Sequence, residues 1–153
     1  MNSEKTNLER TALDKFLNEY NRLNVTTLKF KEHQDKPDFL VEDSKNTKII
    51  GIEVKDLFYD EDEAKILLGR SDTPHHSLMN SNTIIEKLNE CLVSATEKAQ
   101  KYKFNYEMFL LIRVASPIFD ISTFDIYKTD IVVPPNIFSE IWLIHQNDLK
   151  KLK

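Results

Sequence analysis

The stretch KPDFLVEDSKNTKIIGIEVKDLF, residues 36–58, decides the fold because apolar runs alternate in it with turn-forming residues. Residues 38–42 and 48–58 have the composition of strands, and the DSKN segment between them is rich in turn formers. A third extended segment, 27–33, is separated from them by a DKP turn. The sequence therefore predicts a meander of three strands.

Two longer helices are predicted, one before this meander in the sequence and one after it. Apolar residues recur at helical spacing over residues 7–23, ending with Leu23. The second helix is predicted to begin at Thr83, because Thr83 can cap it while Glu86 reaches back to complete a capping box. Its predicted buried stripe consists of Ile84, Ile85, Leu88, Leu92, Ala95, Ala99 and Tyr102.

Two nearly continuous apolar runs follow, at 107–115 and 140–146. Such runs are expected for strands that are covered on both faces in a parallel arrangement. Short helices are predicted near 122–127 and around 62–68. The predicted fold class is therefore α/β, with a mixed (α+β) sheet flanked by helices in a single domain over residues 1–153.

Composition and charge restrict the classes of function. No stretch approaches the ~20 apolar residues of a membrane span and the N-terminus is polar, so we expect a cytoplasmic protein without a membrane partner. The single Cys91 excludes an intramolecular disulfide and a cysteine-based zinc cluster. A net charge of -4 gives no support to nucleic-acid binding by bulk electrostatics, although lysines cluster at 98–103 and 150–153.

Two charged residues of the third strand of the meander, Glu53 and Lys55, share one face. Alternate side chains of a strand point the same way, so Glu53 and Lys55 lie together while Val54 faces the other side. Gly51 lies on the charged face, where its missing side chain is expected to leave room for an ion or a phosphate. Asp38 on the neighbouring strand supplies a second carboxylate, and hard cations such as Mg²⁺ prefer carboxylate and carbonyl oxygens. These residue types fit metal-assisted hydrolysis of a phosphodiester.

The pattern Pro37-Asp38, fourteen intervening residues and then Glu53-Val54-Lys55 resembles the PD-(D/E)XK, or restriction-endonuclease-like, nuclease superfamily. The resemblance implies that Asp38 and Glu53 ligate Mg²⁺ (or Mn²⁺) and that the Val54 carbonyl is a third ligand. It also implies that Lys55 serves the attacking water. The other interpretation is that Asp38 merely follows a turn proline and that Glu53 and Lys55 are an exposed pair on an edge strand.

The resemblance also covers the order of elements from about residue 8 to 115, because the core of that superfamily is αβββαβ. It implies a metal-dependent endonuclease that acts on DNA, in restriction, phage defence or repair, as a homodimer or with a partner subunit. Two alternatives remain open: a catalytically inactive member of the same fold that works as a binding or regulatory subunit, and an α/β interaction protein whose resemblance is accidental.

Glu9 on the first helix is a further candidate for the catalytic and metal-binding set. At about 100° per residue it falls within the apolar arc of the helix, and an inward carboxylate is costly unless it meets a cation or hydrogen-bond donors. The resemblance implies a glutamate from this helix in the site. Alternatively, Glu9 only interacts favourably with the helix dipole or pairs with Lys5 or Arg10.

Three basic residues are candidates for nucleic-acid contacts: Arg70 in a polar loop, and Lys98 and Lys101 on the second helix. Their alternative is simple solvation. Trp142, within an apolar strand, is expected to belong to the core rather than to a base-stacking platform.

Overall fold

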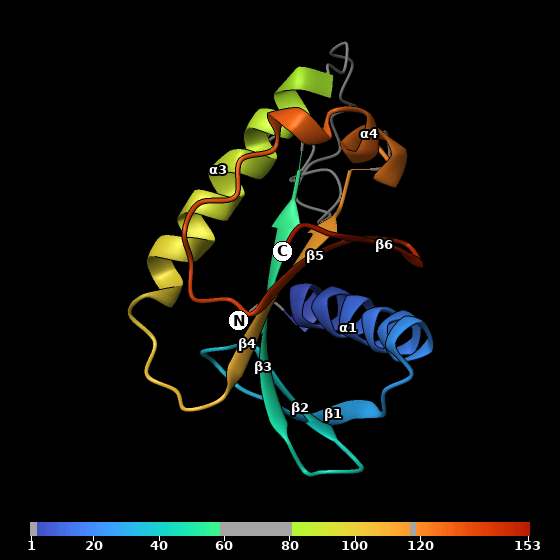
Figure 1. The fold of residues 1–153 in the computed structure, drawn as a ribbon, viewed down its shortest axis with the longest axis vertical. Helices are drawn as coiled ribbons and strands as arrows, with labels where there is room; N and C mark the ends of the chain where they lie inside the picture. Colours follow the sequence, from blue (N-terminus) through green and yellow to red (C-terminus); the bar gives the residue numbers. More distant parts are fainter. Residues whose placement is uncertain (1–2, 59–80, 117–118) are drawn as a thin grey trace.

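A computed structural model describes residues 3–58, 81–116 and 119–153 of the chain (Figure 1). These residues build one six-stranded sheet in the order β1-β2-β3-β4-β5-β6. The strands are β1 (Leu28–His33), β2 (Phe39–Asp43), β3 (Ile49–Leu57), β4 (Glu107–Val114), β5 (Glu140–His145) and β6 (Asp148–Lys151). The helices are α1 (Ser3–Asn24), α3 (Ser81–Ala99) and α4 (Ile121–Ile126), with a 3-10 turn at Lys128–Asp130.

The sheet is mixed. Strands β1, β2 and β3 form an antiparallel meander, as the sequence predicts. Strands β3, β4 and β5 run parallel to one another, and β6 pairs antiparallel with β5. The prediction that the apolar runs form parallel, doubly covered strands is therefore confirmed, because β4 lies between two parallel neighbours and is buried along most of its length.

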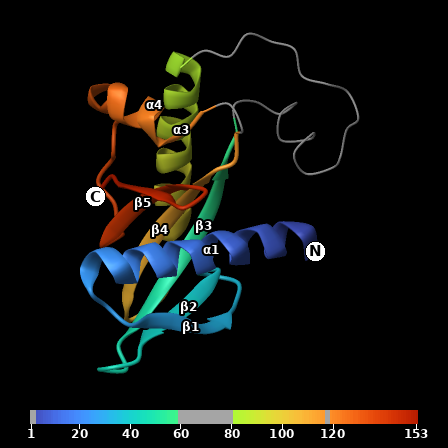
Figure 2. The ribbon, with the colours of Figure 1, turned by 90° about the vertical axis from the view of Figure 1, so that its right-hand side faces the viewer.

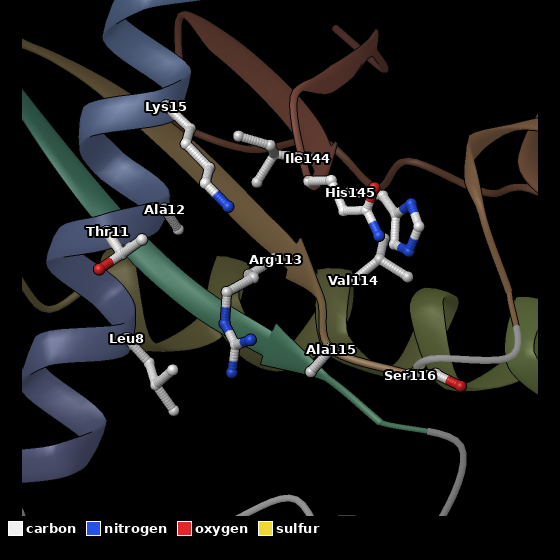
Figure 3. Close-up of a pocket in the computed structure, with 11 residues that line it drawn as sticks. Leu8, Thr11, Ala12, Lys15, Arg113, Val114, Ala115, Ser116, Ile144 and His145 are labelled. Carbon is white, nitrogen blue, oxygen red and sulfur yellow. The ribbon is translucent and has the colours of Figure 1, made fainter.

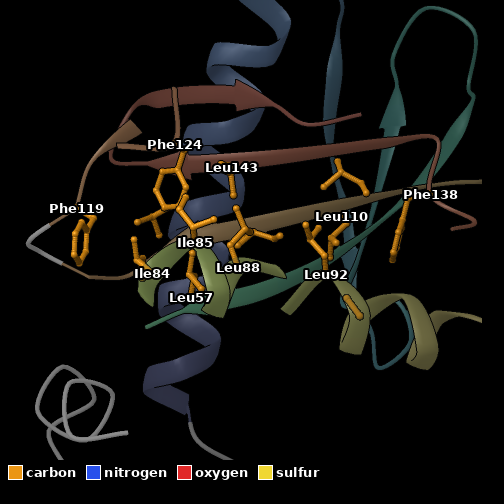
Figure 4. Packing of buried hydrophobic residues seen from close by; sticks show 14 of the residues in the cluster. Leu57, Ile84, Ile85, Leu88, Leu92, Leu110, Phe119, Phe124, Phe138 and Leu143 are labelled. Carbon is orange, nitrogen blue, oxygen red and sulfur yellow. The ribbon is translucent and has the colours of Figure 1, made fainter. Parts of the chain in front are cut away.

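Helices cover both faces of the sheet, with α1 on one side and α3 on the other (Figures 1 and 2). On the α1 side, Leu13 and Phe16 pack with Ile52 and Leu111 in one buried cluster, to which Trp142 belongs as expected. On the α3 side, the predicted buried stripe of the helix packs against β4 and β5. Leu110 of β4 and Leu143 of β5 belong to the same buried cluster (Figure 4). Tyr102 is the exception, because it lies beyond the helix and is only half-buried.

Several element boundaries differ from the predictions. Helix α1 begins at Ser3, and Leu23 near its end is 54% exposed rather than buried. The predicted capping box is wrong, because Thr83 lies inside α3, whose described part already begins at Ser81. Strand β6 was not expected from the basic C-terminal segment. The predicted helix around 62–68 lies outside the described residues.

None of the helices in the described ranges is long and apolar enough to cross a membrane.

Candidate metal centre

The register between β2 and β3 brings Asp38 beside Glu53. Phe39 pairs with Ile52, so one further step along each strand places Asp38 opposite Glu53. The Asp38 amide donates to Glu53 Oε1 at 3.3 Å, and the Val54 amide donates to Asp38 Oδ2 at 2.8 Å. The two carboxylates therefore converge at the end of the β2–β3 ladder, and the interpretation of Glu53 as an exposed residue on an edge strand is wrong.

Glu53 is almost fully enclosed, with 3% of its surface exposed. Its second oxygen, Oε2, accepts a hydrogen bond from the hydroxyl of Tyr102, which follows the C-terminus of α3. Sequence reasoning assigned Tyr102 only to an apolar stripe. The signal for its second role was present, because a tyrosine at the end of a buried stripe has a hydroxyl that needs a partner.

The space beside Gly51 is filled by protein. A Cβ built on Gly51 would lie 2.6 Å from Pro37 Cγ and 2.8 Å from Tyr106 Cε1. The expectation that this glycine leaves room for an ion or a phosphate is therefore wrong. Gly51 is required because a proline ring and a tyrosine ring approach the strand too closely for any side chain.

Burial and the neighbouring carboxylate strongly affect the protonation of Asp38. Desolvation, the hydrogen bond to Glu53 and the charge of Glu53 raise the pKa of Asp38 to about 8, and the Val54 amide opposes this shift only in part. Two carboxylates in contact do not both ionise readily, so Asp38 is protonated near neutral pH. A divalent cation between them would favour the ionised form of Asp38 and so oppose this shift.

Lys55 lies on the same face of β3 as Glu53. The register partners of the two residues on β4, Ile112 and Leu110, both belong to the buried cluster on the α3 side. Lys55 is half-buried and makes no ion pair with a described side chain. The predicted common face of Glu53 and Lys55 is thus confirmed.

Glu9 is buried as predicted, with 8% of its surface exposed. Burial raises its pKa, while Lys5, whose Nζ lies 3.9 Å from Glu9 Oε1, lowers it. Its charge also contributes to the raised pKa of Asp38. Within the described ranges, however, no three His, Cys, Asp or Glu side chains have the spacing of a metal site, so a ligand role for Glu9 stays a prediction.

The three candidate nucleic-acid contacts differ in their surroundings. Lys98 lies in the last turn of α3, whereas Lys101 follows the end of the helix, so the prediction that Lys101 is part of the helix is wrong. Both side chains are exposed. The two lysines are near in sequence to Tyr102, the residue that contacts Glu53. Arg70 lies outside the described residues.

The other face of β3 carries an acidic residue with an opposite environment. Asp56 Oδ1 accepts a hydrogen bond from Arg113 Nε at 2.8 Å, and 7% of the Asp56 side chain is exposed. The register of β3 and β4 places these residues side by side. Sequence reasoning did not anticipate this ion pair, because both partners lie within apolar strands and nothing in the sequence specifies how the strands align.

Comparisons of the chain with protein-family models, with curated proteins and with solved structures found no match. The resemblance to the PD-(D/E)XK superfamily therefore rests on the residues of this chain and on their arrangement.

Proposed function

We propose that the chain is a metal-dependent endonuclease of the PD-(D/E)XK type. The observation that supports this best is the contact between Asp38 and Glu53 at the end of the β2–β3 ladder, with Lys55 on the same face of β3. A buried pair of acidic side chains is costly when, as among the described residues here, no basic side chain pairs with it, and a bound cation would offset that cost.

The donor atoms suit a hard cation such as Mg²⁺ or Mn²⁺. Asp38 and Glu53 would each contribute a carboxylate oxygen. The N–H and C=O of one strand residue point to the same side of the strand, so the Val54 carbonyl is expected on the β2 side of β3, where its amide binds Asp38. A bound cation would neutralise charge on a phosphate and lower the pKa of a water molecule.

The residues of the chain would divide the remaining work. Asp38 and Glu53 would hold the cation once Asp38 has lost its proton. Lys55 would orient the attacking water or stabilise the charge that develops on the phosphate. Tyr102 would fix the orientation of Glu53 through the hydrogen bond to Oε2. Glu9, whose charge acts on Asp38, would favour a cation in the same region.

The proposed substrate is DNA. Lys98 and Lys101, at the exposed end of α3, would contact its phosphates. Cleavage of both strands is simplest with two sites, so we propose that the chain acts as a homodimer or with a partner subunit.

An alternative is a catalytically inactive subunit of the same fold. One observation favours it: both oxygens of Glu53 already accept hydrogen bonds, from the Asp38 amide and from the Tyr102 hydroxyl. An inactive subunit would bind DNA or a partner without cleaving it.

Metal titration combined with a nicking assay tests these proposals. Mn²⁺ binding should be measured calorimetrically for the wild type, Asp38→Ala and Lys55→Ala, and plasmid nicking should be followed in Mg²⁺. The endonuclease predicts that Asp38→Ala loses both metal binding and nicking, and that Lys55→Ala loses nicking by about a hundredfold or more while it still binds metal. Lys45→Ala, at an exposed position in the β2–β3 turn, is the matched control.

Each outcome discriminates between the alternatives. Metal binding that depends on Asp38, without nicking of any DNA or RNA substrate, would favour the inactive subunit. Absence of metal binding in the wild type would remove the basis of both proposals.

A further inference from the structure

A cavity of about 260 Å³ lies on the α1 side of the sheet, where the parallel strands β4 and β5 end (Figure 3). Residues of α1, including Leu8 and Lys15, form one wall. The strand ends and the residues that follow them, among them Arg113 and His145, form the other. The Asp38–Glu53 pair is not part of this cavity, because Glu53 faces α3.

The path of the chain explains why the cavity is there. After β4 the chain passes to the α3 side, where Phe119 and Phe124 join the buried cluster. After β5 it turns back at Gln146, whose φ is 55°, and continues as β6 beside β5. The two connections leave in different directions, and in open α/β sheets such a crevice at the carboxyl ends of parallel strands is the usual place for a ligand.

The polar groups of the cavity are cationic or neutral. Lys15 and Arg113 line it, and none of the described residues that line it is acidic. Lys15 forms no ion pair with any described residue. Arg113 uses Nε to bind Asp56, but a guanidinium also has two terminal nitrogens that can donate to a second oxyanion.

The remaining lining is apolar, with Leu8, Ala12, Val114 and Ile144. A volume of about 260 Å³ approaches the range of roughly 300–1,000 Å³ that is common for small-molecule sites. We propose that this cavity binds a phosphate ester whose organic part presents some apolar surface, as the base of a nucleotide does. Lys15 and Arg113 contact the phosphate, and the apolar wall contacts the nucleoside. The phosphate comes either from a free nucleotide or from a nucleic-acid strand.

Binding measured in EDTA tests this site without involving the metal centre. Inorganic phosphate, adenosine monophosphate, adenosine and a short single-stranded oligonucleotide are titrated against the whole chain, with NMR or calorimetric detection. We expect adenosine monophosphate to bind at least about tenfold more tightly than adenosine, because charge-assisted hydrogen bonds to the phosphate supply the difference. Tighter binding of the oligonucleotide, with the same dependence on Lys15, would assign the phosphate to a nucleic-acid strand.

Variants locate the binding. Lys15→Met keeps most of the side-chain stem and should weaken binding of adenosine monophosphate about tenfold. The double variant Asp56→Asn with Arg113→Gln removes both members of the ion pair together, so no unpaired buried charge remains, and it should weaken binding similarly. Lys45→Met is the matched control and should leave binding unchanged.

The proposal is overturned if none of the phosphate-containing probes binds, if adenosine binds as tightly as its monophosphate, or if both cavity variants bind like the wild type. Because EDTA removes divalent ions, these outcomes are independent of whether the chain cleaves DNA.

Discussion

Two acidic residues of β3, Glu53 and Asp56, lie three positions apart on opposite faces of the sheet and have opposite surroundings. Glu53 faces the α3 side, where it contacts a second carboxylate, Asp38, and the hydroxyl of Tyr102. Asp56 faces the α1 side, where Arg113 neutralises it at 2.8 Å. Both acidic side chains are largely removed from solvent.

This difference separates a structural charge from a candidate functional one. Asp56 is neutralised by Arg113, so the charge of this carboxylate has its partner within the fold. Neither Asp38 nor Glu53 forms an ion pair with a described residue. A fold gains no stability from placing two acids in contact, and local conflicts of this kind are expected at functional sites, where a ligand compensates for them.

The largest expected effect on stability is that of Asp56→Ala. It should lower the free energy of unfolding by about 3 kcal/mol, because it leaves the half-buried Arg113 without its partner. Urea denaturation measures this change. The double variant with Arg113→Met should recover a large part of the loss, since no unpaired charge remains. A loss of stability no greater than that of an exposed substitution such as Lys29→Ala would remove the contrast between the two faces.

The next largest effect tests whether the α3-side face beside Glu53 is packed. Gly51→Ala should lower the free energy of unfolding by about 1 to 3 kcal/mol, because the added Cβ would meet Pro37 and Tyr106 at 2.6 and 2.8 Å. Chemical denaturation with Lys29→Ala as the control measures it. An unchanged stability would instead indicate that open space lies beside this strand.

The sequence predicts the meander and the parallel strands well because their signals are local. Period-two alternation over 48–58 fixes which residues share a face, so the common side of Glu53 and Lys55 follows from the sequence alone. The turn between β1 and β2 then limits where Asp38 can lie. These features identify the Asp38–Glu53 pair before any coordinates are known.

Other features depend on tertiary contacts and have no local signal. The hydroxyl of Tyr102 reaches Glu53 only because the packing of α3 on the sheet brings the end of this helix beside β3. The Asp56–Arg113 pair depends on the register of two parallel strands that are far apart in sequence. Gly51 was misinterpreted for the same reason, since a missing side chain indicates either a ligand or a close neighbour, and only packing decides between them.

A smaller and opposite effect is expected at Asp38. In EDTA, Asp38→Asn should stabilise the chain at pH 9 by about 1 to 2 kcal/mol, because it removes one of two carboxylates in contact. Its amide can still accept from the Val54 amide and can donate to Glu53. The pKa of Asp38 is raised to about 8, so its favourable contribution to wild-type stability is complete below about pH 4 and is lost as the pH rises through 8.

The advantage of Asp38→Asn should therefore be small near pH 4 and grow toward pH 9. Thermal unfolding at a series of pH values in EDTA measures it, with Asp14→Asn on the exposed face of α1 as the control. Equal stability profiles of wild type and Asp38→Asn would mean that the pKa of Asp38 is not raised in the folded chain.

The smallest effects on stability are expected for substitutions of Lys98 and Lys101. These two residues test whether DNA contacts the surface near Tyr102, the residue that binds Glu53. Because both side chains are exposed, Lys98→Ala and Lys101→Ala should unfold like the wild type. If the two lysines contact phosphates of DNA, each substitution should weaken binding several-fold and reduce the slope of log affinity against log salt by about 1.

Lys29→Ala, on the exposed edge strand β1, provides the control at equal net charge. A salt slope unchanged by Lys98→Ala and Lys101→Ala, or changed equally by Lys29→Ala, would mean that DNA does not approach through the C-terminal end of α3.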